Sequence, residues 1–197
     1  MKLFWAPQTR ALRAIWMLEE AGVEYDLELV DIRREDRQDS DEFLRASPLA
    51  KVPAIIDGDV AMSESAAICL YIADRYRPGD LAPAVDDPQR GRFLYWLMYT
   101  PAAVEPAMIE KVSKIESNRV RNAWADFDTM ISTFEEALRG NTWILGEQFS
   151  AADVMLGSSA HFLRSFNMLP ESSNIADYAD RCIAREAFQR AAAISGD

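Results

Sequence analysis

The N-terminal part of the chain begins with a short apolar run, a helical pattern and a second short run. Residues 2–5 are mostly apolar, and a proline soon ends the run. Residues 12–18 carry apolar side chains at helical spacing, with Thr9 at the position of an N-cap and Gly22 just after the last turn. Residues 25–31 alternate in the manner of a strand. The pattern predicts a β-α-β unit with parallel strands.

A hairpin is predicted further along the chain. Two apolar runs flank Asp57-Gly58. That dipeptide favours a two-residue turn, because both central residues of a type I′ turn need positive φ. Pro53 opens the first strand of the hairpin and keeps Val52 extended, which leaves the main-chain groups of Val52 available to another partner.

A helix is predicted directly after this hairpin. Residues 66–72 are mostly apolar, and Ser63-Glu64-Ser65 precedes them. The first turn of a helix offers unpaired N–H groups and the positive end of a dipole, so the pattern predicts a site for a small carboxylate. The alternative is a capped helix with no ligand. With a short helix at residues 41–44, the predicted order is β-α-β-α-β-β-α.

The composition changes to prolines, glycine and charged residues at 77–88, which indicates a linker. The predicted domains are therefore residues 1–78 and 87–197. Pro101 and Pro106 should kink or interrupt the continuation of the first helix of the second domain. Ser and Asp at the start of a later helix form a capping-box pattern. Helices are expected at residues 89–99, 120–138, 150–166 and 178–192.

Charge and composition exclude several kinds of protein. The 197-residue chain has a net charge of −11, and neither half is a basic patch, which argues against nucleic acid or an anionic membrane as a partner. The charged segment at residues 32–40 is typical of a solvated loop. The N-terminus lacks the pattern of a signal peptide and no apolar run is long enough to span a membrane, so a soluble cytoplasmic protein is expected.

Metal and histidine chemistry find little support in the sequence. Cys69 and Cys182 are the two cysteines, and neither lies in a CxxC or Cys/His metal pattern. The single histidine, His161, lies in a predicted helix and is more typical of a helix surface or an interface than of a catalytic triad. No metal is expected.

Four features, taken in order, resemble the cytosolic glutathione S-transferase family of a bacterial type. These are Thr9-Arg10 after the first strand, Val52-Pro53 before the hairpin, Glu64-Ser65 at a helix start, and Ser150-x-x-Asp153 in the helical half. Each motif alone is common, but their order and spacing together are specific. The resemblance covers essentially the whole chain. It implies an α/β plus all-α protein: a thioredoxin-like β-α-β-α-β-β-α domain followed by a helical bundle, and a cis Val52–Pro53 bond.

The resemblance also implies a glutathione site on the first domain. Val52, next to Pro53, would pair through its main chain with the cysteinyl unit of glutathione, like an added strand. Ser65 would hold the γ-glutamyl carboxylate at the helix N-terminus, and Glu64 would lie near the γ-glutamyl ammonium. Lys51 would face the glycyl carboxylate. Glutathione would act as a co-substrate.

Catalysis in this family activates a thiol, because free glutathione is only a few per cent thiolate at neutral pH. Thr9 stands where many members have a serine, so its hydroxyl would donate to the thiolate, and Arg10 would add positive potential. The alternatives are a plain N-cap for Thr9 and a solvent-facing Arg10. The resemblance further implies an acceptor pocket in the helical domain, with Trp96, Tyr99, Ala103 and Phe162 as candidates. Core packing is the alternative for these residues, above all for Trp96.

These features favour a glutathione transferase in which the thiolate attacks a small hydrophobic electrophile. Two alternatives stay open. The first is a glutathione-dependent disulfide or peroxide reductase, as among relatives that lack a strong Tyr or Ser donor. The second is a non-enzymatic binding or regulatory module, against which the intact Glu64-Ser65 argues. The resemblance implies a homodimer.

Overall fold

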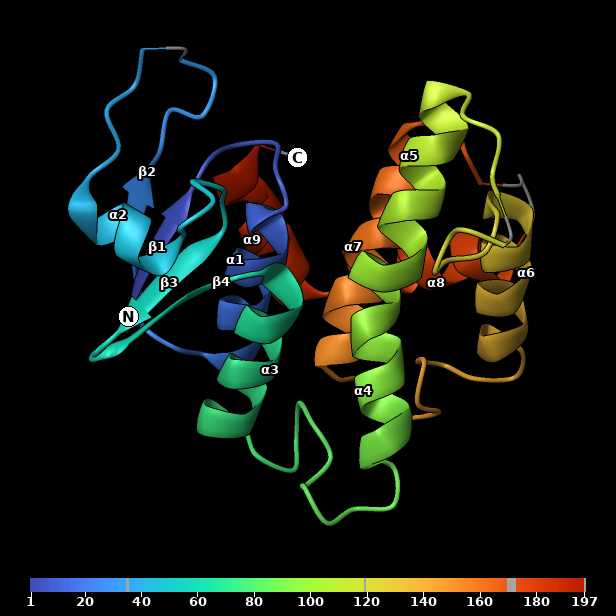
Figure 1. The fold of residues 1–197 in the computed structure, drawn as a ribbon. Coiled ribbons are helices and arrows are strands. Elements are labelled where there is room, and N and C mark those ends of the chain that lie inside the picture. Colours follow the sequence, from blue (N-terminus) through green and yellow to red (C-terminus); the bar gives the residue numbers. More distant parts are fainter. Residues whose placement is uncertain (35, 119, 170–172, 197) are drawn as a thin grey trace. The chain divides into compact units, whose positions relative to one another are not determined.

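The computed structural model describes residues 1–34, 36–118, 120–169 and 173–196 (Figure 1). The chain forms two compact units. One comprises Met1–Ala82 together with Ala184–Asp197, and the other comprises Pro83–Ile183.

A four-stranded sheet organises the first unit. Its strands lie in the order β2-β1-β3-β4. The β1 and β2 strands are parallel, and the other two pairs are antiparallel, which confirms the predicted β-α-β unit. The strands are β1 (Lys2–Trp5), β2 (Asp26–Leu29), β3 (Ala54–Asp57) and β4 (Val60–Ser63).

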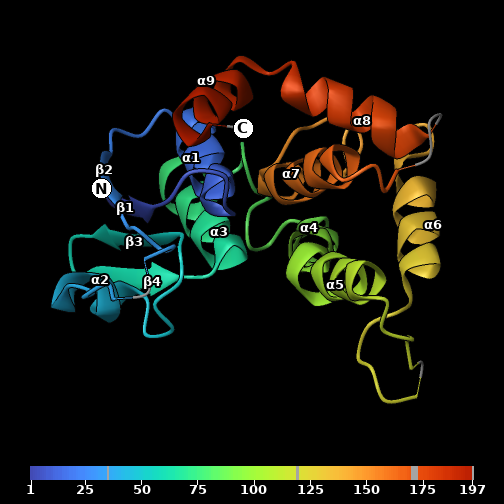
Figure 2. The ribbon, with the colours of Figure 1, turned by 90° about the horizontal axis from the view of Figure 1, so that it is seen from above.

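Helices cover both faces of this sheet. In the first unit, α1 and α3 lie on one face and α2 on the other (Figure 2). The ring of Phe4 on β1 packs against that of Phe43 on α2, with centroids 5.3 Å apart, in a core that also contains Ala46 and Ala54. The helices of this unit are α1 (Ala11–Ala21), α2 (Asp41–Ala46), α3 (Ser65–Tyr76) and α9 (Glu186–Ser195). The order β-α-β-α-β-β-α is as predicted.

The hairpin turn lies one residue later than predicted. Asp57 pairs with Val60, so Gly58 and Asp59 form the two-residue turn. Gly58 has φ 61, a conformation that glycine adopts without steric cost. The prediction that Asp57 would be a central turn residue was therefore wrong.

The side chain of Asp57 explains why this residue stays in the strand. Its Oδ2 accepts hydrogen bonds from Tyr71 Oη at 2.8 Å and from Tyr76 Oη at 2.6 Å. Arg75 Nε lies 3.2 Å from the same oxygen. The carboxylate thus ties the end of β3 to the last turns of α3.

The last predicted helix is in fact two helices. The chain is not helical at residues 184–185, and α8 (Asn174–Ile183) is separate from α9. Arg185 makes an ion pair with Glu20 of α1, and Phe188 packs edge-on against Trp16 with centroids 4.9 Å apart. Packing therefore groups α9 with the first unit. The division into domains at residues 1–78 and 87–197 stays a prediction from the sequence.

A long helical rod begins the second unit. It runs through α4 (Arg90–Tyr99), a π-helical turn at Thr100–Val104 labelled η1, and α5 (Glu105–Ser113). Figure 1 shows the three segments in line. Pro101 lies in η1. A proline inside a helix removes one N–H donor and crowds the preceding turn, which accounts for the π-helical turn at this place. At the place where a kink or an interruption was predicted, the helix passes through a π-helical turn and continues as α5.

The amphipathic helix predicted from residue 120 begins later. It is α6 (Phe127–Leu138), capped by Asp126, whose side chain accepts a hydrogen bond from Thr129 N at 2.9 Å. Trp124 lies before the helix although its spacing fits the apolar pattern. The Asp126 cap sets the start of the helix, since an N-cap aspartate satisfies a first-turn N–H.

The central helix of the second unit is α7 (Ala151–Ser165). Its capping box, predicted from Ser150 and Asp153, is present. Asp153 is fully buried and accepts hydrogen bonds from Ile144 N, Ser150 N and Tyr178 Oη at 2.8–2.9 Å. Burial raises the pKa of Asp153 to about 6, although these hydrogen bonds favour the ionised form. Within the described residues, no helix is both long and apolar enough to cross a membrane.

Candidate functional site

Three segments meet at one end of the sheet because of its strand register. Phe4 of β1 pairs with Ala54 of β3, and Ala54 pairs with Ser63 of β4. Since β3 is antiparallel to both neighbours, the end of β1, the start of β3 and the end of β4 lie side by side. The turn with Thr9, the Val52–Pro53 bond and the Glu64-Ser65 pair therefore lie at the same end of the sheet, where β1 and β4 finish and β3 begins.

The first of these segments is the turn between β1 and α1. Thr9 Oγ1 donates a hydrogen bond to Ala6 O at 2.7 Å and accepts one from Ala11 N at 3.2 Å. Thr9 is half-buried and Arg10 is exposed. Arg10, rather than Thr9, occupies the N-cap position of α1, and its φ of −61° and ψ of −6° are already helical. The hydroxyl of Thr9 nevertheless satisfies a first-turn N–H.

The second segment is the loop that precedes β3. Ser47 Oγ donates to Lys51 O at 2.7 Å and accepts from Lys51 N at 2.9 Å. Arg37 Nη2 donates to Ala50 O at 2.8 Å, and Ala50 has φ 52. These contacts hold the main chain of the loop, while the side chain of Lys51 is exposed.

The Val52–Pro53 bond follows this loop and is cis, as the resemblance implies. Pro53 is buried, and Val52 packs against the core around Phe4 and Phe43. Among the described residues, neither the N–H nor the C=O of Val52 has a hydrogen-bond partner. An extended ligand main chain can therefore pair with Val52 at this end of the sheet.

The third segment is the N-terminus of α3. Glu64 is exposed and has φ 73, which is unusual for a residue other than glycine. Ser65, the first residue of α3, is 9% exposed. The first N–H groups of α3 have no acceptor within the helix, so they and the helix dipole favour an anion here. A strained backbone beside such a site is typical of functional positions.

The candidates for an acceptor pocket lie in the second unit. Trp96 and Tyr99 are buried, and their rings pack with centroids 4.9 Å apart. Tyr99 Oη donates to Met130 O at 3.1 Å, and burial raises the pKa of Tyr99 to about 12. Ala103 in η1 and Phe162 on α7 are half-buried. Contact with an acceptor stays a prediction for all four residues.

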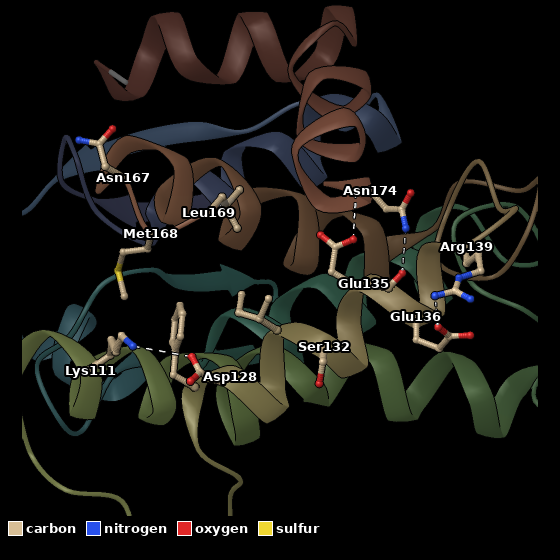
Figure 3. A pocket seen from close by; sticks show the side chains of 12 residues that line it. Lys111, Asp128, Ser132, Glu135, Glu136, Arg139, Asn167, Met168, Leu169 and Asn174 are labelled. Carbon is tan, nitrogen blue, oxygen red and sulfur yellow. Dashed lines mark hydrogen bonds and ion pairs between the residues drawn. The ribbon is translucent and has the colours of Figure 1, made fainter. Parts of the chain in front are cut away.

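A cleft of about 750 Å³ opens beside α6 in the second unit (Figure 3). Lys111 pairs with Asp128 at 3.7 Å, and Arg139 pairs with Glu136 at 2.7 Å. Glu135 accepts hydrogen bonds from the first N–H groups of α8. None of the predicted site residues lines this cleft. The lining residues are Lys111, Phe127, Asp128, Ile131, Ser132, Glu135, Glu136, Arg139, Asn167, Met168, Leu169 and Asn174.

Cysteine chemistry and metal binding gain nothing from the structure. Cys69 and Cys182 are buried, and neither forms a disulfide. Burial raises the pKa of Cys69 to about 12, which disfavours a thiolate. In the parts of the chain that the structure describes, no three metal-binding side chains of His, Cys, Asp or Glu gather.

Sequence reasoning missed two contacts of the Thr9 turn. Arg33 Nη2 donates to Pro7 O at 3.4 Å, and Ser195 O accepts from Gln8 N at 3.0 Å. Arg33 lies in the segment that was interpreted as a solvated loop; Glu35 of that segment lies outside the described residues. No local pattern in the sequence signals either contact, because both partners are distant along the chain.

Comparison with known proteins identifies the family. Residues 9–75 match the model of the glutathione S-transferase N-terminal domain, and residues 116–181 match that of the C-terminal domain. The chain is 33% identical to glutathione S-transferase hmp2 of Hypomyces subiculosus over 179 residues, 84% of each chain. It is 26% identical to glutathione S-transferase GstA of Escherichia coli O157:H7, covering 100% of this chain and 99% of that protein.

A solved structure agrees in fold and in extent. The structure of a sphingomonad glutathione S-transferase complexed with glutathione superposes with a TM-score of 0.82 at 26% identity. The match covers 100% of this chain and 99% of that chain. Both family models lie in the order expected from the two units, and the two relatives match over 84% or more of each chain. The chain therefore belongs to the glutathione S-transferase family.

Proposed function

We propose that this glutathione transferase binds glutathione at the end of the sheet where the segments with Thr9, Val52 and Ser65 lie. The observation that carries the proposal is the register of Phe4, Ala54 and Ser63, which brings the three segments to one end of the sheet. A main-chain pairing group, a helix N-terminus and a hydroxyl are the groups that an extended peptide with a terminal carboxylate and a thiol requires.

Each part of the tripeptide has a partner of suitable chemistry. The cysteinyl main chain pairs with the N–H and C=O of Val52, beside Pro53. The γ-glutamyl carboxylate lies against Ser65 and the N-terminus of α3, and its ammonium lies near Glu64. The exposed side chain of Lys51 reaches the glycyl carboxylate.

Thr9 then stabilises the thiolate. Its hydroxyl donates to Ala6 O at 2.7 Å. Rotation of the Thr9 side chain redirects this proton to the sulfur, and the N-terminus of α1 with Arg10 adds positive potential. The thiol proton leaves to solvent, and the thiolate forms a C–S bond with the electrophilic carbon of a small hydrophobic acceptor, whose leaving group departs with the displaced electron pair.

The remaining parts of the proposal concern the acceptor and the assembly. Tyr99, Trp96, Ala103 and Phe162 are proposed to contribute the apolar acceptor wall. A homodimer is supported by apolar side chains exposed along the α4–η1–α5 rod, namely Tyr95, Met98, Ile109 and Val112. A cytoplasmic location is proposed on the family resemblance.

Glutathione-dependent disulfide reduction is a second candidate function. The hydrogen bond from Thr9 to Ala6 favours it, since the hydroxyl is already engaged and is a weaker thiolate donor than a free one. Parallel assays with a conjugation acceptor and with a glutathione mixed disulfide separate the two activities. Relatives named as transferases favour an enzyme over a binding module.

Calorimetric titration of glutathione tests the binding site. The Ser65→Ala variant should weaken binding about tenfold, because one charge-assisted hydrogen bond to the carboxylate is lost. Ser132→Ala is a matched control, since Ser132 Oγ is exposed and donates only to Thr129 O within α6. Equal affinity in the parent and in Ser65→Ala would contradict the assignment.

A further inference from the structure

We propose that Ser195, the last residue of α9, is a positioning residue for the thiol-activating turn. Its carbonyl oxygen holds Gln8, the residue before Thr9. The proposal rests on the function proposed above for Thr9. It adds a role for the C-terminal helix, which lies outside both stretches that match the family models.

The contact is a main-chain hydrogen bond between the two ends of the chain. Gln8 N donates to Ser195 O at 3.0 Å. Gln8 has φ 56, a left-handed conformation that side-chain-bearing residues rarely adopt. A hydrogen bond to this N–H favours the unusual conformation, and Thr9 follows it directly.

The end of α9 supplies an acceptor for a general reason. The last four carbonyls of a helix lack partners within the helix. Gly196, in the left-handed conformation, closes the helix and donates to Ala192 O, which satisfies one of these carbonyls. Ser195 is fully buried, so its carbonyl needs a partner, and Gln8 N–H provides one.

The position of α9 against α1 is firmly set. Arg185 makes a two-point ion pair with Glu20, at 2.5 and 2.7 Å, and Glu20 also accepts from Trp16 Nε1 at 2.9 Å. Arg190 Nε lies 2.6 Å from Glu19 Oε2. These contacts fix Ser195 relative to the helix whose N-terminus faces the proposed thiol.

The role of Ser195 becomes larger when the thiol is activated. The Thr9 hydroxyl donates to Ala6 O and so helps to close the turn. Redirecting that proton to the sulfur breaks this internal bond. The contacts that then hold residues 7 and 8 from distant parts of the chain are Gln8–Ser195 and the exposed, longer contact of Arg33 with Pro7 O.

A positional role and an electrostatic role of α9 predict opposite results. The C-terminal end of a helix carries negative potential, so removing it would lower the pKa of a nearby thiol if the effect were electrostatic. If Ser195 instead positions Thr9, its loss lets the hydroxyl move away and raises the pKa of the bound thiol. The sign of the change therefore distinguishes the two.

The test compares chains that stop after Ile194 and after Ser195. Both lack the Gly196 cap and carry a terminal carboxylate one residue apart, so the acceptor for Gln8 is the main difference. The thiol pKa of bound glutathione is followed by the ultraviolet absorbance of the thiolate, and affinity by calorimetry. We expect the thiolate fraction at neutral pH to fall about tenfold in the chain ending at Ile194, with affinity changed less than about threefold. The chain ending at Ser195 should resemble the full chain.

An unchanged or lowered thiol pKa in the folded chain ending at Ile194 overturns the proposal. If that chain does not fold, Arg185→Ala decides instead, because it removes the ion pair with Glu20 that holds α9 against α1. Gln189→Ala is the control, since Gln189 is an exposed residue of the same helix. Arg185→Ala should raise the thiol pKa, and no difference between these two variants overturns the proposal.

Hydrogen exchange of the Gln8 amide in the full, unliganded chain tests the contact independently. Slow exchange supports it, and exchange as fast as an exposed loop amide overturns it. A full chain that leaves the glutathione thiol at its free pKa would instead refute the proposed function of Thr9, whatever the exchange rate of Gln8.

Discussion

Ala54 and Ser63 are direct partners on the antiparallel strands β3 and β4. The pairing places the cis Val52–Pro53 bond beside the N-terminus of α3, because one segment precedes Ala54 and the other follows Ser63. Strand hydrogen bonds thereby hold the two segments proposed to bind glutathione, the main chain of Val52 and the N-terminus of α3, next to each other. The predictions below test this arrangement and the parts of the fold that support it.

Thr9 variants test thiol activation. Thr9→Val keeps the shape of the side chain but removes the hydroxyl, so the pKa of bound glutathione should rise and kcat/KM at neutral pH should fall about tenfold or more. Thr9→Ser should retain most of the activity. A pH profile of kcat/KM is the measurement, and a profile of Thr9→Val that overlays the parent would remove Thr9 from the mechanism.

Glu64→Gly should change stability and binding in opposite directions. Glycine adopts the φ of 73 at this position without steric cost, so the variant should unfold at higher urea concentration, with a gain of about 1 kcal/mol. Loss of the carboxylate near the γ-glutamyl ammonium should weaken glutathione binding. Urea unfolding and calorimetry measure the two effects. Tighter binding by the variant would show that Glu64 does not contact the ligand.

Asp57 should make stability sensitive to acid. Burial opposes ionisation of Asp57, but hydrogen bonds from Tyr76 and Tyr71 and the charge of Arg75 outweigh it and hold the pKa below its ordinary value of 3.8. The stabilisation is present above that value and is lost as the pH falls through the lower folded-state pKa. Asp57→Asn should therefore lose less stability than the parent in strong acid. Parallel acid-unfolding curves of the two proteins would contradict this.

Asp153 should respond to pH in the opposite sense. Burial raises the pKa of its carboxyl from 3.8 to about 6 in the folded protein. Protonation therefore favours folding, and this contribution is complete below the unfolded pKa and is lost as the pH rises through about 6. The free energy of unfolding of the parent, relative to Asp153→Asn, should decrease between pH 4 and pH 7, a range about that of the shift. Urea titrations across this range measure it; a difference that grows with pH would be the contrary result.

Asp153→Asn should also destabilise the second unit at every pH. Its amide NH₂ would face the donors Ser150 N and Ser150 Oγ, leaving buried donors unsatisfied at a cost of about 1–3 kcal/mol. Asp128→Asn is the control, since Asp128 is exposed and its pair with Lys111 spans 3.7 Å; it should change stability by less than about 0.5 kcal/mol. Equal effects of the two substitutions would argue against the capping box as a major support.

Local chemistry in the sequence predicted much of the fold and two of the segments to which the proposal assigns glutathione binding. Pro53 indicated the strand start and the unpaired main chain of Val52, and the apolar run after Ser65 indicated the helix N-terminus. Both features depend on neighbouring residues alone. The cis bond came only from the family resemblance, because nothing local distinguishes a cis from a trans proline.

The errors arose where side chains or distant packing override local pattern. Asp57 is predicted as a turn residue from its neighbour Gly58, but its hydrogen bonds with Tyr71 and Tyr76 keep it in the strand. Asp126 caps α6, so the helix begins after Trp124 although the apolar spacing extends back to that residue. The contact of Gln8 with Ser195 joins the two ends of the chain, so no sequence window contains it.

A crystal structure of the protein with bound glutathione tests the central claim most directly. We expect the cysteinyl main chain to make hydrogen bonds of about 2.9 Å with Val52, the γ-glutamyl carboxylate to lie at Ser65, and the sulfur to lie within hydrogen-bonding distance of Thr9 Oγ1. Glutathione bound elsewhere, for example in the cleft beside α6, with the main chain of Val52 unpaired, would contradict the account.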